Sequence, residues 1–290
     1  MLRRTMIKLG VLLPLATTAC AAQTEQPLTI VSGKPSASPR ALRYAEAAGV
    51  LAGRPGTMGI IVWDRQSNTF WREGDTAHPT WTASTVKLAI VTSLLEQART
   101  HKITLSGADH QDVAAVLDVS DDNAATRLWN KCGKDKLVPR FRQAYGMTGL
   151  TFVDGFPRFW GHMKCTAEDL MRLMAYVLEK VNPQDREFLL DRMRHVGAIQ
   201  QWGAWAAGPS QQPGVKNGWS IEPDGGQKHW VANTVGFAGP GARYAIAAMY
   251  DLPAGKTIDD GVHAVSDVIA TIFGQVVPAK VTVPDPSTGL

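Results

Sequence analysis

A single lysine inside an apolar stretch is the feature that most constrains how this chain can fold. Residues 86–95 read Val-Lys-Leu-Ala-Ile-Val-Thr-Ser-Leu-Leu, and this nearly continuous apolar run predicts a helix that crosses a core. A buried lysine raises the free energy of the fold unless its amine is paired or loses its proton. Lys87 therefore indicates a special environment, and Ser84 precedes it by one helical turn, on the same face.

The chain has enough apolar material to build that core. It contains 290 residues, of which 44% are hydrophobic and 19% are charged, as in one large globular domain or two lobes. The formal net charge of +4 is distributed without a long basic run. We therefore expect no nucleic-acid groove, because such a groove needs clustered lysine and arginine.

The first residues are typical of an export signal. A basic segment that contains Arg3 and Arg4 precedes an apolar stretch too short to span a bilayer. The arginine pair resembles a twin-arginine signal, so we expect a signal peptide over residues 1–22 and a polar linker over residues 23–39. Cys20 lies in an imperfect lipobox and is a lipidation candidate, with ordinary signal cleavage as the alternative. Both place the mature protein outside the cytoplasmic membrane, in the periplasm or an equivalent space, touching the membrane only through a lipid anchor.

Two other cysteines, Cys132 and Cys165, remain after Cys20 is assigned to the signal. A disulfide between them suits an oxidising compartment, and two buried free thiols are an equally good interpretation. The histidines show no metal-ligand spacing with these cysteines, so we expect no metal site.

Strand patterns occur at both ends of the chain and enclose a helical stretch. Periodicity predicts strands over residues 59–64, 69–71, 215–220, 229–237 and 243–250, and helices over 41–51, 113–117, 124–129, 137–145, 167–179, 185–194 and 260–273. Early and late segments must then complete one sheet together. This predicts a mixed α/β (α+β) domain over residues 40–275, with a sheet lobe (40–80 and 200–275), a helical lobe (81–199) and a disordered tail (276–290).

Three short motifs follow one another along this domain. They are Ser-Thr-Val-Lys at 84–87, Ser-Asp-Asp at 120–122 and Lys-Asn-Gly at 216–218. Each one alone has an ordinary explanation, such as a chance pair, a helix N-cap or an exposed strand lysine. Together and in this order they are typical of serine β-lactamases and penicillin-binding proteins.

The chain resembles class A β-lactamases over residues 40–273. The hairpin that begins at residue 59, His78-Pro79 before the first motif, and the strands at 230–237 and 244–249 agree with that family in order and context. The resemblance implies a five-stranded antiparallel sheet flanked by helices beside an all-helical lobe, with the site between the lobes. It also implies a small-molecule β-lactam or a cell-wall peptide as substrate and no cofactor, and we expect a monomer.

The motif residues suggest how such a site would work. Ser84 would be the nucleophile, and Lys87 would take its proton once burial and a second cation, Lys216, have lowered the pKa of Lys87. Ser120 would relay a proton to the departing nitrogen. The backbone N–H groups of Ser84 and Trp219 would form the oxyanion hole.

One departure from the family concerns deacylation. Class A enzymes carry a glutamate within a Glu-x-x-Leu-Asn pattern that activates the deacylating water, and this chain has no such pattern. The corresponding segment, residues 150–165, is short and aromatic, with Asp154 and His162 as its candidate bases.

Other departures lie in the predicted substrate contacts. Asp122 stands where the family has asparagine, and Asn123 compensates if the loop is shifted by one residue. Asn217 replaces the usual threonine or serine beside Gly218, and its amide would have to hold a substrate carboxylate.

Three functions are compatible with these residues. The first is an exported serine hydrolase that forms an acyl-enzyme at Ser84 with β-lactams or related amides and esters and deacylates slowly. The second is a cell-wall D,D-peptidase, and the third is a non-catalytic exported binding protein.

Overall fold

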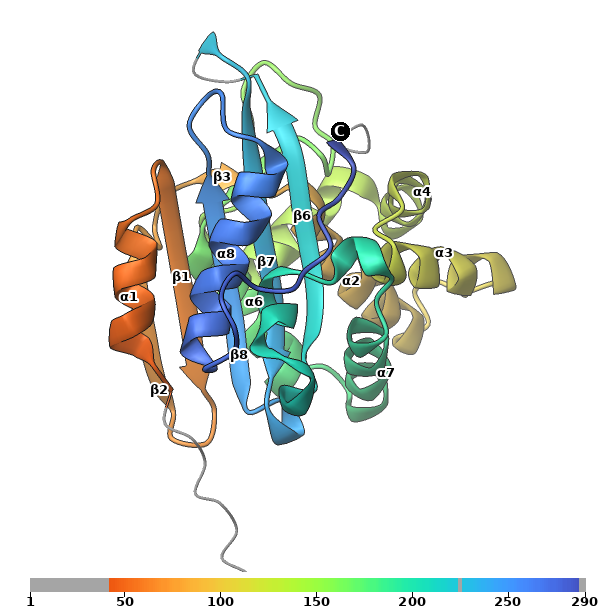
Figure 1. Ribbon diagram of the computed structural model, residues 1–290. Helices are drawn as coiled ribbons and strands as arrows, with labels where there is room; N and C mark the ends of the chain where they lie inside the picture. The colour runs from red at the N-terminus through yellow and green to blue at the C-terminus, as the bar shows by residue number, and fades with distance from the viewer. Residues whose placement is uncertain (1–41, 224–225, 287–290) are drawn as a thin grey trace, which may run out of the picture. The chain divides into compact units, whose positions relative to one another are not determined.

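A five-stranded antiparallel sheet forms the centre of the fold, in the order β2-β1-β8-β7-β6 (Figure 1). Strands β1 (Thr57–Asp64) and β2 (Thr69–Gly74) come from the start of the domain, and β6 (Gly214–Glu222), β7 (His229–Ala238) and β8 (Tyr244–Asp251) come from its end. The predicted sheet, built from both ends of the chain, is therefore confirmed.

The structure is a computed structural model that describes residues 42–223 and 226–286. The predicted signal peptide (1–22), Cys20 and the linker (23–39) lie outside the described residues. Within the described ranges, no helix combines the length and the apolar character needed to cross a bilayer.

Helices cover both faces of the sheet. On one face, α1 (Tyr44–Ala52) and α8 (Ile258–Ile272) pack against each other and on the strands (Figure 1). On the other face, α6 (Ala167–Glu179) contacts β1 and β8, and the remaining helices extend the core from there. These are α2 (Lys87–Arg99), α3 (Gly107–Asp118), α4 (Asp122–Cys132), α5 (Val138–Gln143) and α7 (Pro183–Arg194). Two large apolar clusters therefore lie on opposite faces of one sheet.

The predicted helices are confirmed, and helix caps explain why several of them begin where they do. Ser106 and Asp109 form a capping box that starts α3, several residues before the apolar pattern becomes visible. Thr166 and Asp169 do the same for α6.

A small second sheet was not predicted from the sequence. It consists of β3 (Thr80–Trp81), β5 (Met163–Cys165) and β4 (Thr151–Phe152), in the order β3-β5-β4. Strands of two or three residues are too short to show an alternating pattern in the sequence. For this reason β4 and β5 were not predicted, and they lie in a segment that was expected to be helical. The backbone N–H of Thr82 continues this pairing by donating to the Met163 carbonyl at 2.8 Å, which fixes the entry to the Ser84 motif.

The predicted disordered tail is wrong for residues 276–286. The Ala279 N–H donates to an Asp267 carboxylate oxygen at 2.8 Å, and the Thr282 N–H donates to the Gln201 carbonyl at 3.2 Å. Val281 and Val283 also pack against the apolar cluster that contains α8. The segment has no periodicity of its own because it is held by contacts with distant residues.

Of the two interpretations of Cys132 and Cys165, the disulfide is wrong, since both cysteines are free and buried. Cys132 ends α4, whereas Cys165 lies in β5 with its sulfur 3.8 Å from that of Met249. Burial raises the pKa of Cys132 to about 12 and that of Cys165 well above the ordinary value. Both are therefore neutral packing residues, which was the alternative interpretation.

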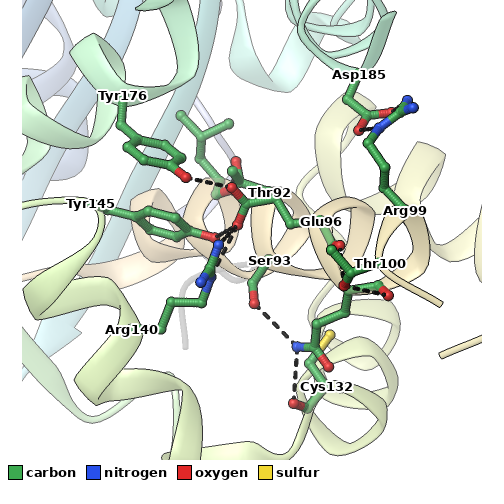
Figure 2. A network of polar contacts seen from close by, with 12 residues as sticks. Thr92, Ser93, Glu96, Arg99, Thr100, Cys132, Arg140, Tyr145, Tyr176 and Asp185 are labelled. Carbon is green, nitrogen blue, oxygen red and sulfur yellow. Dashed lines mark hydrogen bonds and ion pairs between the residues drawn. The ribbon is translucent and has the colours of Figure 1, made fainter. Parts of the chain in front are cut away.

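A polar network fixes the C-terminal half of α2, as Figure 2 shows. One carboxylate oxygen of Glu96 accepts from Arg140, at 3.0 and 2.6 Å, and from the Tyr145 hydroxyl at 2.5 Å. The other accepts from the Tyr176 hydroxyl at 2.6 Å. One side chain thus joins the central helix to α6 and to the segment that follows α5.

We expect Glu96→Ala to lower the free energy of unfolding by about 2 kcal/mol, because two hydroxyls and a guanidinium lose a shared acceptor. Urea unfolding measures this. The matched control is Glu46→Ala, which removes an exposed glutamate paired with Arg43 and should change stability by less than about 0.5 kcal/mol. Equal effects of the two substitutions would contradict this role for Glu96.

Candidate active site

The Ser84 motif begins with a strained turn. Residues Ala83–Val86 form one turn of 3₁₀-helix directly before α2, and Ala83 has a φ of 43°. A left-handed conformation of a residue with a Cβ costs roughly 1–3 kcal/mol and persists only where the surroundings impose it. Here Thr85 donates its hydroxyl to the Thr82 carbonyl at 2.6 Å, and Ser84 is only 6% exposed. The turn therefore holds Ser84 at a defined place at the start of α2.

Strand β6 lies directly against this turn. A Cβ added to Gly218 would lie 2.7 Å from the backbone nitrogens of Ser84 and Thr85 and 2.9 Å from the Thr82 carbonyl oxygen. Since these are backbone atoms, only glycine fits at this position. The third motif thus meets the first by close backbone contact at Gly218.

Lys87 is fully buried at the beginning of α2, with its amine surrounded by acceptors. Its Nζ donates to the Ser120 carbonyl at 2.6 Å and to the Ser120 hydroxyl at 3.3 Å, and it forms an ion pair with Asp122. The Trp160 ring covers the amine, with its centroid 4.6 Å from Nζ. Burial lowers the pKa of Lys87, and the Asp122 carboxylate opposes that shift.

Lys216 approaches the same hydroxyl from β6. Its Nζ donates to the Ser120 hydroxyl at 2.8 Å, to the Gln200 side-chain oxygen at 2.9 Å and to the Asn217 carbonyl at 2.8 Å. Burial, reinforced by the charge of Lys87, holds the pKa of Lys216 well below its ordinary value. The structure therefore brings Lys87, Ser120 and Lys216 together beside Ser84.

The Ser120 hydroxyl has a distinctive position between these two amines. A hydroxyl offers two acceptor lone pairs and one hydrogen, and Lys87 and Lys216 each donate toward its oxygen. Its hydrogen is then left to donate to a third group. Ser120 also has a φ of 64°, a second left-handed residue at this site.

Gln200 is a residue of this site that the sequence motifs did not indicate. It is fully buried, and its side-chain oxygen accepts from Lys216 and from the Asn217 backbone N–H at 3.1 Å. Its own amide donates to the Leu117 carbonyl at 2.5 Å. It thus links β6 to the end of α3, and no short motif surrounds it.

Trp160 is a second such residue. The aromatic character of the segment 150–165 was its only sign in the sequence. Its indole N–H donates to the Thr126 hydroxyl at 3.2 Å, which fixes the ring over Lys87. The two candidate bases of that segment lie elsewhere, since Asp154 is exposed and His162 has a ring nitrogen 3.1 Å from the Pro157 carbonyl.

The residues predicted to contact a substrate differ in their burial and in their hydrogen bonds. The Asn217 side chain is buried, and its amide donates to the Gln200 and Trp202 carbonyls at 2.9 and 3.2 Å, so both amide hydrogens are already used. Asn123 is exposed in the first turn of α4. Trp219 follows Gly218 on β6, opposite Ala232 of β7.

We expect Gly218→Ala to destabilise the protein by about 1–3 kcal/mol, because the added methyl group forces the Ser84 turn and β6 apart. The control is Gly49→Ala in α1, where no described residue lies within 4 Å of the new methyl group and the helix should gain stability. Thermal and urea unfolding of both variants provide the measurement. A stable Gly218→Ala protein would mean that the turn does not lie against β6.

Solved structures of similar fold show that this chain has a β-lactamase/transpeptidase-like fold. PBP-A matches with a TM-score of 0.66 and 18% identity, over 80% of this chain and 94% of that one. A β-lactamase from Xanthomonas campestris matches with a TM-score of 0.63 and 17% identity, over 79% and 94%. The ancestral class A β-lactamase GNCA matches with a TM-score of 0.63 and 15% identity, over 80% and 98%.

Curated sequences add a different kind of relative. The chain is 28% identical over 226 residues to "Putative lipoprotein LppW" of Mycobacterium tuberculosis and of Mycobacterium bovis, which covers 72% of this chain and 70% of those proteins. No protein-family model matches the chain. The predicted fold is therefore confirmed, and the chemistry has to be argued from the residues.

Proposed function

We propose that this protein is an exported serine hydrolase of the β-lactamase type that forms an acyl-enzyme at Ser84 with β-lactams or related amides and esters. The observation that carries the proposal is the convergence of two buried amines, Lys87 and Lys216, on the hydroxyl of Ser120 next to the Ser84 turn. Burying two lysines opposes folding, and a serine whose reactivity depends on them is a reason to retain both.

The acylation step follows from these positions. The Ser84 oxygen attacks a carbonyl carbon as its proton moves toward Lys87, and the N–H groups of Ser84 and Trp219 stabilise the oxyanion. Ser120 then gives its free hydrogen to the departing nitrogen as the C–N bond breaks. The buried amines return a proton to Ser120.

Release of the acyl group should be slow. The Trp160 ring covers the Lys87 amine and shields that side of it from water, and the segment 150–165 brings no carboxylate to the amine. Among the described residues, Asp122 is the carboxylate in contact with Lys87.

The export proposal rests on residues outside the described ranges. The signal-like segment 1–22 with Cys20 supports an exported protein held at the membrane by a lipid. The relative's designation as a lipoprotein agrees with this.

One observation favours a non-catalytic binding protein as a second candidate. Lys87 has three acceptors, two on Ser120 and one on Asp122, and no hydrogen bond to Ser84 is found within the described residues. An ammonium group whose three hydrogens all have acceptors has no lone pair with which to take a proton from Ser84. The cell-wall D,D-peptidase shares the acylation step and differs only in the acyl donor and acceptor.

The primary test is covalent labelling of the full exported protein. We expect incubation with a fluorescent penicillin to add the mass of one ligand, because the penicillin carbonyl becomes esterified to Ser84. Intact mass spectrometry measures the adduct, and turnover of a chromogenic cephalosporin measures hydrolysis. Ser84→Ala should abolish the adduct, whereas Ser67→Ala, at an exposed serine of the β1–β2 turn, should keep it. No adduct with the penicillin or with an ester or peptide acyl donor would favour the binding protein.

We expect Trp160→Leu to shorten the lifetime of the adduct severalfold, since it removes the ring that keeps water from Lys87. Trp160→Phe is the matched control, because it keeps a ring over the amine and loses only the bond to Thr126, at about 0.5–1.5 kcal/mol of stability. The decay of the adduct mass after removal of free penicillin measures both. Identical decay in Trp160→Leu and the wild type would remove Trp160 from this role.

A further inference from the structure

We propose that Asp122 is the acceptor that takes a proton from Lys87 during acylation, so that the neutral Lys87 amine can take the Ser84 proton. The family resemblance had suggested only a substrate contact for this position. The inference rests on the proposed function. It identifies the group that allows Lys87 to act as a base at the same site.

The contacts around Lys87 carry the argument. An ammonium group has three hydrogens, and the amine faces three acceptors, which are the carbonyl and hydroxyl of Ser120 and one Asp122 carboxylate oxygen. A carbonyl cannot take a proton at neutral pH, and the Ser120 hydroxyl is already committed to Lys216. Asp122 is therefore the contact through which Lys87 can become a neutral amine.

The exposure of the two partners supports the same assignment. The Lys87 side chain is fully buried, whereas that of Asp122 is 36% exposed. Transfer of a proton between them replaces a partly buried ion pair by two neutral groups, which the exclusion of water around Lys87 favours. Asp122 thus connects the buried amine to the solvent side of the site.

Other charged groups near the amine do not offer this route. Asp121, on the same turn, uses its carboxylate to cap α4 by accepting from the Ala124 N–H at 2.6 Å. Lys216, on β6, directs its amine to the Ser120 hydroxyl, the Gln200 side chain and the Asn217 carbonyl, all of which accept from it. From the loop 150–165 the amine meets the ring of Trp160, which has no acidic group.

The proton balance closes over the whole acylation. A Lys87 proton moves to Asp122, which leaves an amine and a carboxylic acid. That amine takes the Ser84 hydroxyl proton as the oxygen bonds to the carbonyl carbon, and the C=O electron pair moves onto oxygen. The pair returns as the C–N bond breaks and Ser120 protonates the nitrogen. Lys87 then reprotonates Ser120, and Asp122 returns its proton to Lys87.

Asp122→Asn separates this proposal from a mechanism in which Lys87 acts alone. The Asp122 charge raises the pKa of Lys87, so its removal would leave more neutral amine at pH 7. If Lys87 acted alone, labelling would be as fast as in the wild type or faster, with the pH–rate profile moved to lower pH. If Asp122 is the acceptor, labelling slows by roughly 10²-fold, the lower end for losing general-base assistance.

The experiment measures the rate of fluorescent-penicillin labelling of the full chain between about pH 5 and pH 8, the range over which protein stability tends to be greatest. Asp122→Asn should be slow across the range, and Asp122→Glu should recover much of the rate because it restores a carboxylate. The control, Asp121→Asn, keeps a capping side chain and should retain near-wild-type labelling.

Each outcome decides one claim. A fast Asp122→Asn with a profile at lower pH overturns the role of Asp122 and leaves the acyl-enzyme intact. A wild type that takes no label from penicillin, ester or peptide donors overturns the proposed function itself. If thermal melting shows that Asp122→Asn does not fold, Asp122→Glu decides, since a rate near that of the wild type supports the proposal and loss of labelling in a folded variant overturns it.

Discussion

The burial of two lysine amines around one serine hydroxyl is the constraint on which the site depends. Neither Lys87 nor Lys216 has any exposure, and each has a lowered pKa because water is excluded. Such groups are tolerated only when every hydrogen has an acceptor. The residues that provide those acceptors are therefore as necessary to the fold here as the apolar core around them. They are Ser120, Asp122, Gln200 and the Asn217 carbonyl.

The architecture explains how these groups come together from distant parts of the chain. β6 is an edge strand of the sheet, so it can lie against the Ser84 turn without losing its pairing with β7. Gly218 permits that approach, and the small sheet that includes Met163 fixes the entry to the turn. The Glu96 network then holds the far half of α2, so the same helix is fixed near both ends.

The sequence predicted most of this arrangement because its strongest features are local. The apolar run around Lys87, the ordered motifs and the alternation in the main strands each lie within a few consecutive residues. Gln200 and Trp160 could not be predicted, because their roles arise from contacts with Lys216 and Lys87, residues far away in the chain. The ordered segment 276–286 was missed for the same reason, since distant residues hold it in place.

The enclosure of Lys216 also limits what the site can bind. Its amine already donates to three acceptors, and the Asn217 amide has no hydrogen left. A substrate carboxylate could be held by either group only if these bonds were broken, which would leave buried partners unsatisfied. Under the proposed function, Lys216 would therefore act on Ser120 and not on a substrate carboxylate, and the acyl donor would be recognised by other groups around Ser84.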